Sequence, residues 1–154
     1  MIVTFFGHSE FLKTEECAQR MLELLGERVG DHPAEMYLGG YGNYDDFAYE
    51  CCKRYKKMHP HISLVLVTPY LTDSYQRNHL KLQEKRYDCV LYPGIEDKPK
   101  KYAITYRNRY MIEQADFVIA YISHNFGGAY TAYRYAKRKG KTVFNLAQKE
   151  LKEK

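Results

Sequence analysis

Short apolar runs alternate along the chain with longer segments in which apolar residues recur every three or four positions. The runs predict six β-strands, at 2–6, 34–38, 62–67, 88–92, 117–122 and 142–146. The segments between them predict helices, at 14–29, 45–58, a stretch that includes Leu80, Lys81 and Lys85, 104–114 and 129–138. Because strands that are apolar on both faces are typical of parallel sheets covered by helices, the alternation predicts an α/β, Rossmann-like three-layer fold. Its sheet is expected to be mostly parallel, with helices on both faces.

The composition is that of a folded domain of ordinary size. The 154 residues include 16 Tyr and 7 Phe but no Trp, and this aromatic content argues against disorder. We expect a single domain over 1–148 and a polar C-terminal tail over 149–154. The N-terminus, MIVTFFGHSEF, lacks the features of a signal peptide, and the other apolar runs have strand length. We therefore expect a cytoplasmic protein that makes no contact with a membrane.

The four cysteines, Cys17, Cys51, Cys52 and Cys89, show no metal-binding spacing. No CxxC pair is present, and no histidines follow at zinc-like intervals. We expect reduced and mostly buried thiols, no metal site and no cofactor.

Charge is distributed unevenly along the chain. The net charge is +5, but residues 1–50 hold three basic and ten acidic residues, whereas residues 51–154 hold 21 basic and nine acidic ones. A basic half indicates a partner that carries phosphate, either a nucleotide or a nucleic acid. The alternative, that lysine-rich helix faces are simply solvated, predicts the same charge.

Loops rich in small residues, each with at least one glycine, follow the first, second and fifth predicted strands. They read GHS at 7–9, GGYGN at 39–43 and HNFGGAYT at 124–131. Parallel strands bring such loops to one edge of the sheet, where open α/β folds bind ligands. Glycine lets the backbone approach a ligand closely, and free amides at a helix N-terminus favour phosphate. No GxxxxGK[ST] or GxGxxG motif is present, which disfavours Walker-type ATP hydrolysis and NAD redox chemistry.

We predict a pocket of the nucleotide type at this edge. Its expected ligand-binding residues are Gly7, His8, Ser9, Gly39, Gly40, Tyr41, Asp45, Arg107, Arg109, Asn125, Gly127, Gly128, Ala129, Tyr130 and Thr131. The amides of the third loop would take the phosphate, and Tyr41 or Tyr130 would stack on a base. Arg107 or Arg109 would neutralise the charge, and spacing alone does not decide between the two. A helix cap is the alternative role for Asp45.

His8 and His124 both follow predicted strands, so they are expected to approach each other at the mouth of the pocket. A role for either histidine in acid–base chemistry competes with the simpler interpretation of a hydrogen-bonded loop residue.

Three segments together resemble the SLOG superfamily, a Rossmann-like group that includes the DprA and LOG proteins, and within it the YpsA-like branch. These segments are GGYGNYDDFA at 39–48, RNRYMIEQAD at 107–116 and FGGAYTAYRYAKRKGKTVFNL at 126–146. In the first, Gly39, Gly40, Asp45 and Ala48 fit the pattern GGAxGxDxxA. The second fits RNxxMxxxAD, and the third contains a glycine pair followed by YAKxxGK. Tyr41 and Asn43 depart from the branch pattern.

The resemblance implies a ligand derived from a nucleotide, with its phosphate on the glycine loop before the last helix. LOG-type phosphoribohydrolases carry PGGxGTxxE, but here Phe126 stands at the proline, Tyr130 at the third glycine and Arg134 at the glutamate. Thr131 matches the threonine. A cation cannot replace a carboxylate in stabilising an oxocarbenium ion. We therefore expect a sensor or accessory domain, not a LOG-type hydrolase, that binds a nucleotide-like or ADP-ribose-like ligand.

Two other functions remain open. One is cleavage or transfer at an N-glycosidic bond, with Asp45 or Glu10 in place of the missing glutamate. The other, less favoured, is binding of single-stranded nucleic acid through the basic, tyrosine-containing runs at 53–57 and 133–141. Both runs lie on predicted helix faces, which favours plain solvation. A homodimer formed through helices is also possible.

Overall fold

The computed structural model describes residues 1–80 and 85–147. In this part of the chain, helices and strands alternate as the apolar pattern predicts. Their bounds are β1 (Ile2–Gly7), α1 (Glu15–Arg28), β2 (Ala34–Leu38), α2 (Asn43–Met58), β3 (Ile62–Val67), α3 (Asp73–Tyr75), the π-helical turn η1 (Gln76–Leu80), β4 (Cys89–Leu91), the 3-10 turn η2 (Lys100–Tyr102), α5 (Ala103–Gln114), β5 (Phe117–Tyr121), α6 (Gly128–Arg138) and β6 (Thr142–Asn145).

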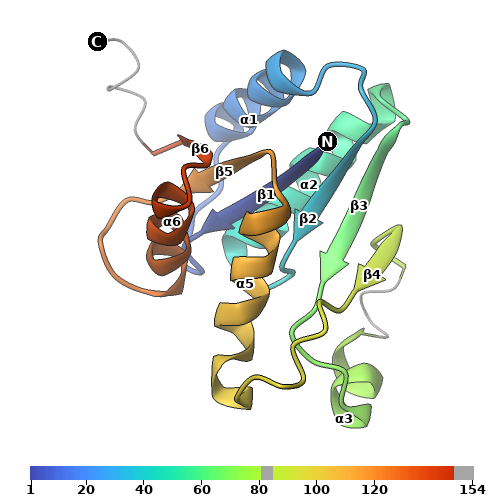
Figure 1. Ribbon diagram of the computed structural model, residues 1–154. Helices are drawn as coiled ribbons and strands as arrows, with labels where there is room; N and C mark the ends of the chain where they lie inside the picture. The colour runs from blue at the N-terminus through green and yellow to red at the C-terminus, as the bar shows by residue number, and fades with distance from the viewer. Residues whose placement is uncertain (81–84, 148–154) are drawn as a thin grey trace.

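The six strands form one parallel sheet in the order β4-β3-β2-β1-β5-β6. The chain runs from β1 outward to β4, then returns to the other side of β1 to form β5 and β6 (Figure 1). Strand order therefore reverses between β1 and β5, where Thr4 aligns with Val118. In an open sheet of this kind, the crevice at the carboxyl ends of these two strands is the usual ligand site.

Helices cover both faces of the sheet, so the predicted three-layer α/β architecture is confirmed. Helices α5 and α6 lie in front of the sheet in Figure 1 and α2 lies behind it. The buried residues form two clusters, one beneath α1 and α2 and one beneath α5 and α6. Successive side chains of β1 serve opposite faces, since Phe5 belongs to the first cluster and Phe6 to the second.

Local signals account for several element boundaries. Thr14 caps α1, because its side chain accepts a hydrogen bond from the N–H of Cys17 at 3.1 Å, and Glu15 and Glu16 follow in the first turn. Helix α6 begins after Gly127, whose φ of +93° lies in the region that favours glycine. Both helix starts follow the predicted pattern.

Some predictions differ from the structure in detail. Helix α2 begins at Asn43, two residues earlier than predicted, and β4 is shorter than the predicted strand at 88–92. The helix expected around Leu80 and Lys85 is a short helical segment that continues as η1 up to Leu80, while Lys85 lies in a turn. Lys81 and the predicted tail at 149–154 lie outside the described residues. The division into one domain and a tail stays a prediction.

Three of the four thiols are buried as expected, but Cys89 is exposed because β4 forms an edge of the sheet. Among the described residues, no helix is both long enough and apolar enough to cross a membrane.

Candidate functional site

A cavity of about 320 Å³ lies at the carboxyl ends of β1, β2 and β5, where strand order reverses. This volume is at the small end of the range for ligand cavities, which is roughly 300–1,000 Å³. Ten of the residues predicted from the glycine-rich loops and α5 line it: Gly7, His8, Ser9, Gly39, Tyr41, Asp45, Arg107, Gly127, Gly128 and Ala129. Three loops far apart in the sequence thus meet around one cavity.

Five predicted residues lie elsewhere. Gly40 has a structural role, because only glycine readily adopts its φ of +66° and an added Cβ would lie 2.7 Å from Cδ1 of Leu66. Asn125 is exposed in the loop before α6. The other three predicted residues, Arg109, Tyr130 and Thr131, line a neighbouring groove between α5 and α6.

The cavity also contains residues that the list of predicted ligands omitted. They are Phe5, Phe6, Glu10, Ile104, Asn108, His124 and Phe126. Glu10, Asn108 and His124 were visible in the motifs or as loop residues. Phe5 and Phe6 belong to β1, and Phe126 lies in the loop before α6. That the two β1 residues border the cavity follows only from their position at the end of the sheet.

Gly7 lines the cavity, but a side chain at this position would clash with a residue of the core. A Cβ at Gly7 would lie 2.2 Å from Cγ of Tyr44. The Tyr44 ring is fully buried, and its hydroxyl donates a hydrogen bond to the carbonyl of Ile119 at 2.9 Å. The Tyr44 side chain is thus held at both ends, and the Gly7 backbone packs directly on its ring.

The third loop leads into α6 with open space around its glycines. An added Cβ at Gly127 or Gly128 would meet no atom within 4 Å. The N–H of Thr131 is the first of the helix to bond within it, to the carbonyl of Gly127 at 3.0 Å. The preceding amides of the first turn have no partner within the helix by its geometry, so they are suited to an anion.

The structure distinguishes the two candidate arginines. Arg107 is buried, and its Nη1 donates to the carbonyls of Gly39 at 3.2 Å and Val67 at 2.8 Å. Its Nε donates to Oδ1 of Asn108 at 2.8 Å. Arg107 therefore links α5 to the ends of β2 and β3 while it borders the cavity. Arg109 is half-buried, with its guanidinium over the rings of Tyr106 and Tyr135.

Asp45 lies in the first turn of α2 beside Arg107. Its Oδ2 accepts a hydrogen bond from the N–H of Tyr41 at 2.8 Å, so it stabilises the loop that enters the helix. Burial raises the pKa of the Asp45 carboxyl to about 7, against the lowering effects of the Tyr41 N–H and the Arg107 charge. A carboxyl with this pKa can change its charge near neutral pH. Tyr41 itself is 67% exposed at the rim, where a flat ring can stack on a ligand.

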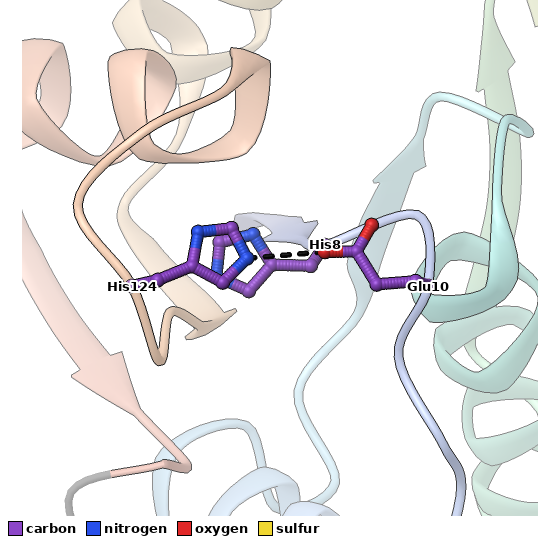
Figure 2. A group of neighbouring side chains, drawn as sticks. All are labelled: His8, Glu10 and His124. Atoms are coloured by element: carbon purple, nitrogen blue, oxygen red, sulfur yellow. Dashed lines mark hydrogen bonds and ion pairs between the residues drawn. The ribbon is translucent and has the colours of Figure 1, made fainter.

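The two loop histidines meet, as predicted. The rings of His8 and His124 stack with centroids 3.5 Å apart and planes inclined by 15° (Figure 2). His8 Nε2 accepts a hydrogen bond from the N–H of Ser123 at 3.0 Å, which fixes the ring and places a proton of the neutral form on Nδ1. His124 Nε2 pairs with Oε1 of Glu10 at 3.1 Å and its ring also stacks on Phe126.

Burial lowers the pKa of His8, and the nearby His124 lowers it further. The hydrogen bond from His124 lowers the pKa of the Glu10 carboxyl. These shifts favour a neutral His8 beside a carboxylate paired with His124. Among the described residues, the buried Nδ1 of His124 has no hydrogen-bond partner.

His8, Glu10 and His124 each offer one ligand atom, and these atoms lie within 4.8 Å of one another. Two imidazoles and a carboxylate suit zinc. Here, however, the ring planes are nearly parallel, so the nitrogen lone pairs do not converge, and Nε2 of His8 already accepts a hydrogen bond. To coordinate an ion, the two rings would first have to separate.

No protein-family model matches the sequence, and no curated protein matches it significantly. Solved structures do resemble it. One is DNA processing protein A from Helicobacter pylori, a protein with a unique mode of binding single-stranded DNA. It aligns with a TM-score of 0.62 and 20% identity over 99% of this chain and 72% of that one.

A second similar structure is the structural genomics target TM1055. It aligns with a TM-score of 0.55 and 14% identity, over 97% of this chain and 79% of that one. At these identities the two likenesses support the Rossmann-like α/β fold and no finer assignment.

Proposed function

We propose that the protein binds a nucleotide or a nucleotide-derived ligand, as a sensor or accessory domain, in the cavity formed by the three loops. The observation that carries the proposal is the position of that cavity, where strand order reverses and α6 begins. Gly127 and Gly128 leave the N-terminus of α6 open to a phosphate, and Arg107 supplies positive charge from the adjacent wall. Tyr41 at the rim offers a ring for a base.

The test is isothermal titration calorimetry with AMP, ADP, ADP-ribose and cyclic nucleotides. We expect at least one of them to bind and Gly128→Asp to weaken that binding by at least about tenfold, because it adds a negative charge where the phosphate would lie. Gly26→Asp is the matched control, since Gly26 is also a helical glycine with no atom within 4 Å of an added Cβ. The proposal is wrong if no nucleotide binds, or if the two variants bind equally well.

An enzymatic function is the second candidate, because the carboxyls of Glu10 and Asp45 both line the cavity. Arg134, at the position of the LOG-type glutamate, lies outside the cavity in the neighbouring groove. This arrangement favours binding over N-glycosidic cleavage. Incubation with nucleoside monophosphates and chromatography for the free base tests the point, and we expect no base to be released.

Binding of single-stranded DNA is the third candidate, since DNA processing protein A from Helicobacter pylori, which has a similar fold, binds single-stranded DNA. The run at 53–57 gives this candidate little support, because Tyr55 is buried and Lys56 pairs with Asp88 at 2.7 Å. A gel shift whose affinity falls steeply with salt would favour it over the small-ligand proposal.

We further propose that the chain belongs to the SLOG superfamily, in its YpsA-like branch. The motifs quoted above and the fold shared with DNA processing protein A support this relation.

A further inference from the structure

The groove between α5 and α6 is separate from the candidate cavity but adjoins it. Its volume is about 410 Å³. Its lining includes the polar residues Asn108, Arg109, Thr131, Arg134 and Arg138. We call this hollow the arginine groove. Ile104, Asn108 and Gly128 line both hollows, so the two meet at the N-terminus of α6.

The charged residues that line the arginine groove are all basic, and the nearby carboxylate of Glu113 accepts a hydrogen bond from the hydroxyl of Tyr135. Three arginines line the groove, and its lining in the described part of the chain includes no carboxylate. The candidate cavity, in contrast, contains the carboxyls of Glu10 and Asp45. Positive potential along the combined hollow therefore increases from the cavity toward the groove.

Aromatic rings orient the three guanidinium groups. The Cζ of Arg109 lies 5.0 Å from the ring centroid of Tyr135, and that of Arg138 lies 5.4 Å from the same ring. The Cζ of Arg134 lies 5.8 Å from the ring centroid of Tyr130, and its Nη1 donates a hydrogen bond to the Tyr130 hydroxyl at 3.4 Å. A guanidinium group that lies over a ring keeps its N–H edge available, so Arg109 and Arg138 are partly preorganised to donate to an anion. Arg134 is held by its bond to Tyr130 and has other N–H groups to offer.

We propose that the arginine groove is a second anion subsite, which takes a phosphoryl group of the ligand beyond the phosphate at the N-terminus of α6. This inference rests on the proposed function and narrows its ligand to nucleotides that carry at least two phosphoryl groups. Paired N–H donors of arginine match the oxygens of a phosphoryl group, and the side-chain amide of Asn108 adds a neutral donor.

The second phosphoryl group could belong to a nucleoside di- or triphosphate or to a 5′-phosphorylated dinucleotide. These ligands place it differently, as part of a continuous polyphosphate or as a phosphodiester between two nucleosides. Calorimetry with AMP, ADP, ATP and the dinucleotide pApA therefore separates the two sources.

We expect ADP and ATP, or pApA, to bind roughly 10- to 100-fold more tightly than AMP, which is the effect of one or two charged hydrogen bonds. In the double variant R134Q/R138Q this ratio should fall toward one. The matched control is K57Q/K137Q, which removes the same amount of positive charge. Lys57 and Lys137 are exposed and lie outside the lining of the groove, so the ratio should be preserved.

Each outcome decides the question. If Gly128→Asp weakens the binding of AMP but ADP, ATP and pApA bind no more tightly than AMP, the proposal of a second subsite is wrong and the proposed function stands. If both double variants reduce the ratio equally, the gain is general electrostatics and the groove is not a subsite. If no nucleotide binds, both proposals fail.

Discussion

At the carboxyl edge of the sheet, a single residue can line the cavity and also pack against the core. Gly7 borders the cavity, yet the atom that forbids a side chain there belongs to Tyr44. Sequence patterns cannot separate these two reasons for a glycine, because both predict a small residue at the end of a strand. The contact between Gly7 and a buried ring assigns most of the constraint to packing.

Gly7→Ala should therefore reduce the free energy of unfolding by at least about 1–3 kcal/mol, the usual cost of overpacking, because the Tyr44 ring has no free direction in which to move. Urea denaturation followed by far-UV circular dichroism measures the change. Gly26→Ala is the control: an added Cβ meets nothing within 4 Å in α1, so helix propensity should raise stability by roughly 0.5–1 kcal/mol. Equal stability of the two variants would contradict the packing argument.

At the scale of elements, one buried cation and one carboxyl connect helices to the sheet edge. Arg107 fastens α5 to the ends of β2 and β3, while Asp45 holds the loop between β2 and α2. The sequence placed both residues at the site, but it left the choice between Arg107 and Arg109 open. The hydrogen bonds of Arg107 join positions 68 and 40 residues away, and no local spacing can predict such contacts.

The Asp45 carboxyl should make stability depend on pH. Its pKa is about 7 in the folded protein against an ordinary value of 3.8, so between these values the folded state holds a proton that the unfolded chain has lost. Its stabilising contribution is therefore complete below about pH 4 and is lost as the pH rises through about 7. We expect the free energy of unfolding of the wild type, relative to that of Asp45→Asn, to decline between pH 4.5 and 8.

Denaturation of both proteins over this range measures that difference and cancels the other titrating groups. A difference that stays constant or grows with pH would contradict the raised pKa of Asp45.

The whole molecule places two apolar clusters on opposite faces of one sheet. Every strand of the sheet is joined to its neighbours, and β1 contributes side chains to both clusters. The clusters therefore share their backbone, which couples their stability.

Thermal unfolding should accordingly be one cooperative transition. Tyrosine side chains occur in both clusters, so near-UV circular dichroism reports on both faces and far-UV circular dichroism reports on the backbone. The two curves should superimpose with the same midpoint. Two resolved transitions would mean that the faces unfold separately.

The sequence by itself determined the order of the elements, the parallel three-layer architecture and the loops that meet at its carboxyl edge. Those features follow from the period of apolar residues and from glycine after strands, which are local properties. Only the tertiary structure decided that Arg107 faces the cavity while Arg109 faces the arginine groove, and that His8 stacks on His124. The physical reason is that such contacts depend on which strands lie side by side, and strand order is not encoded in the spacing of neighbouring residues.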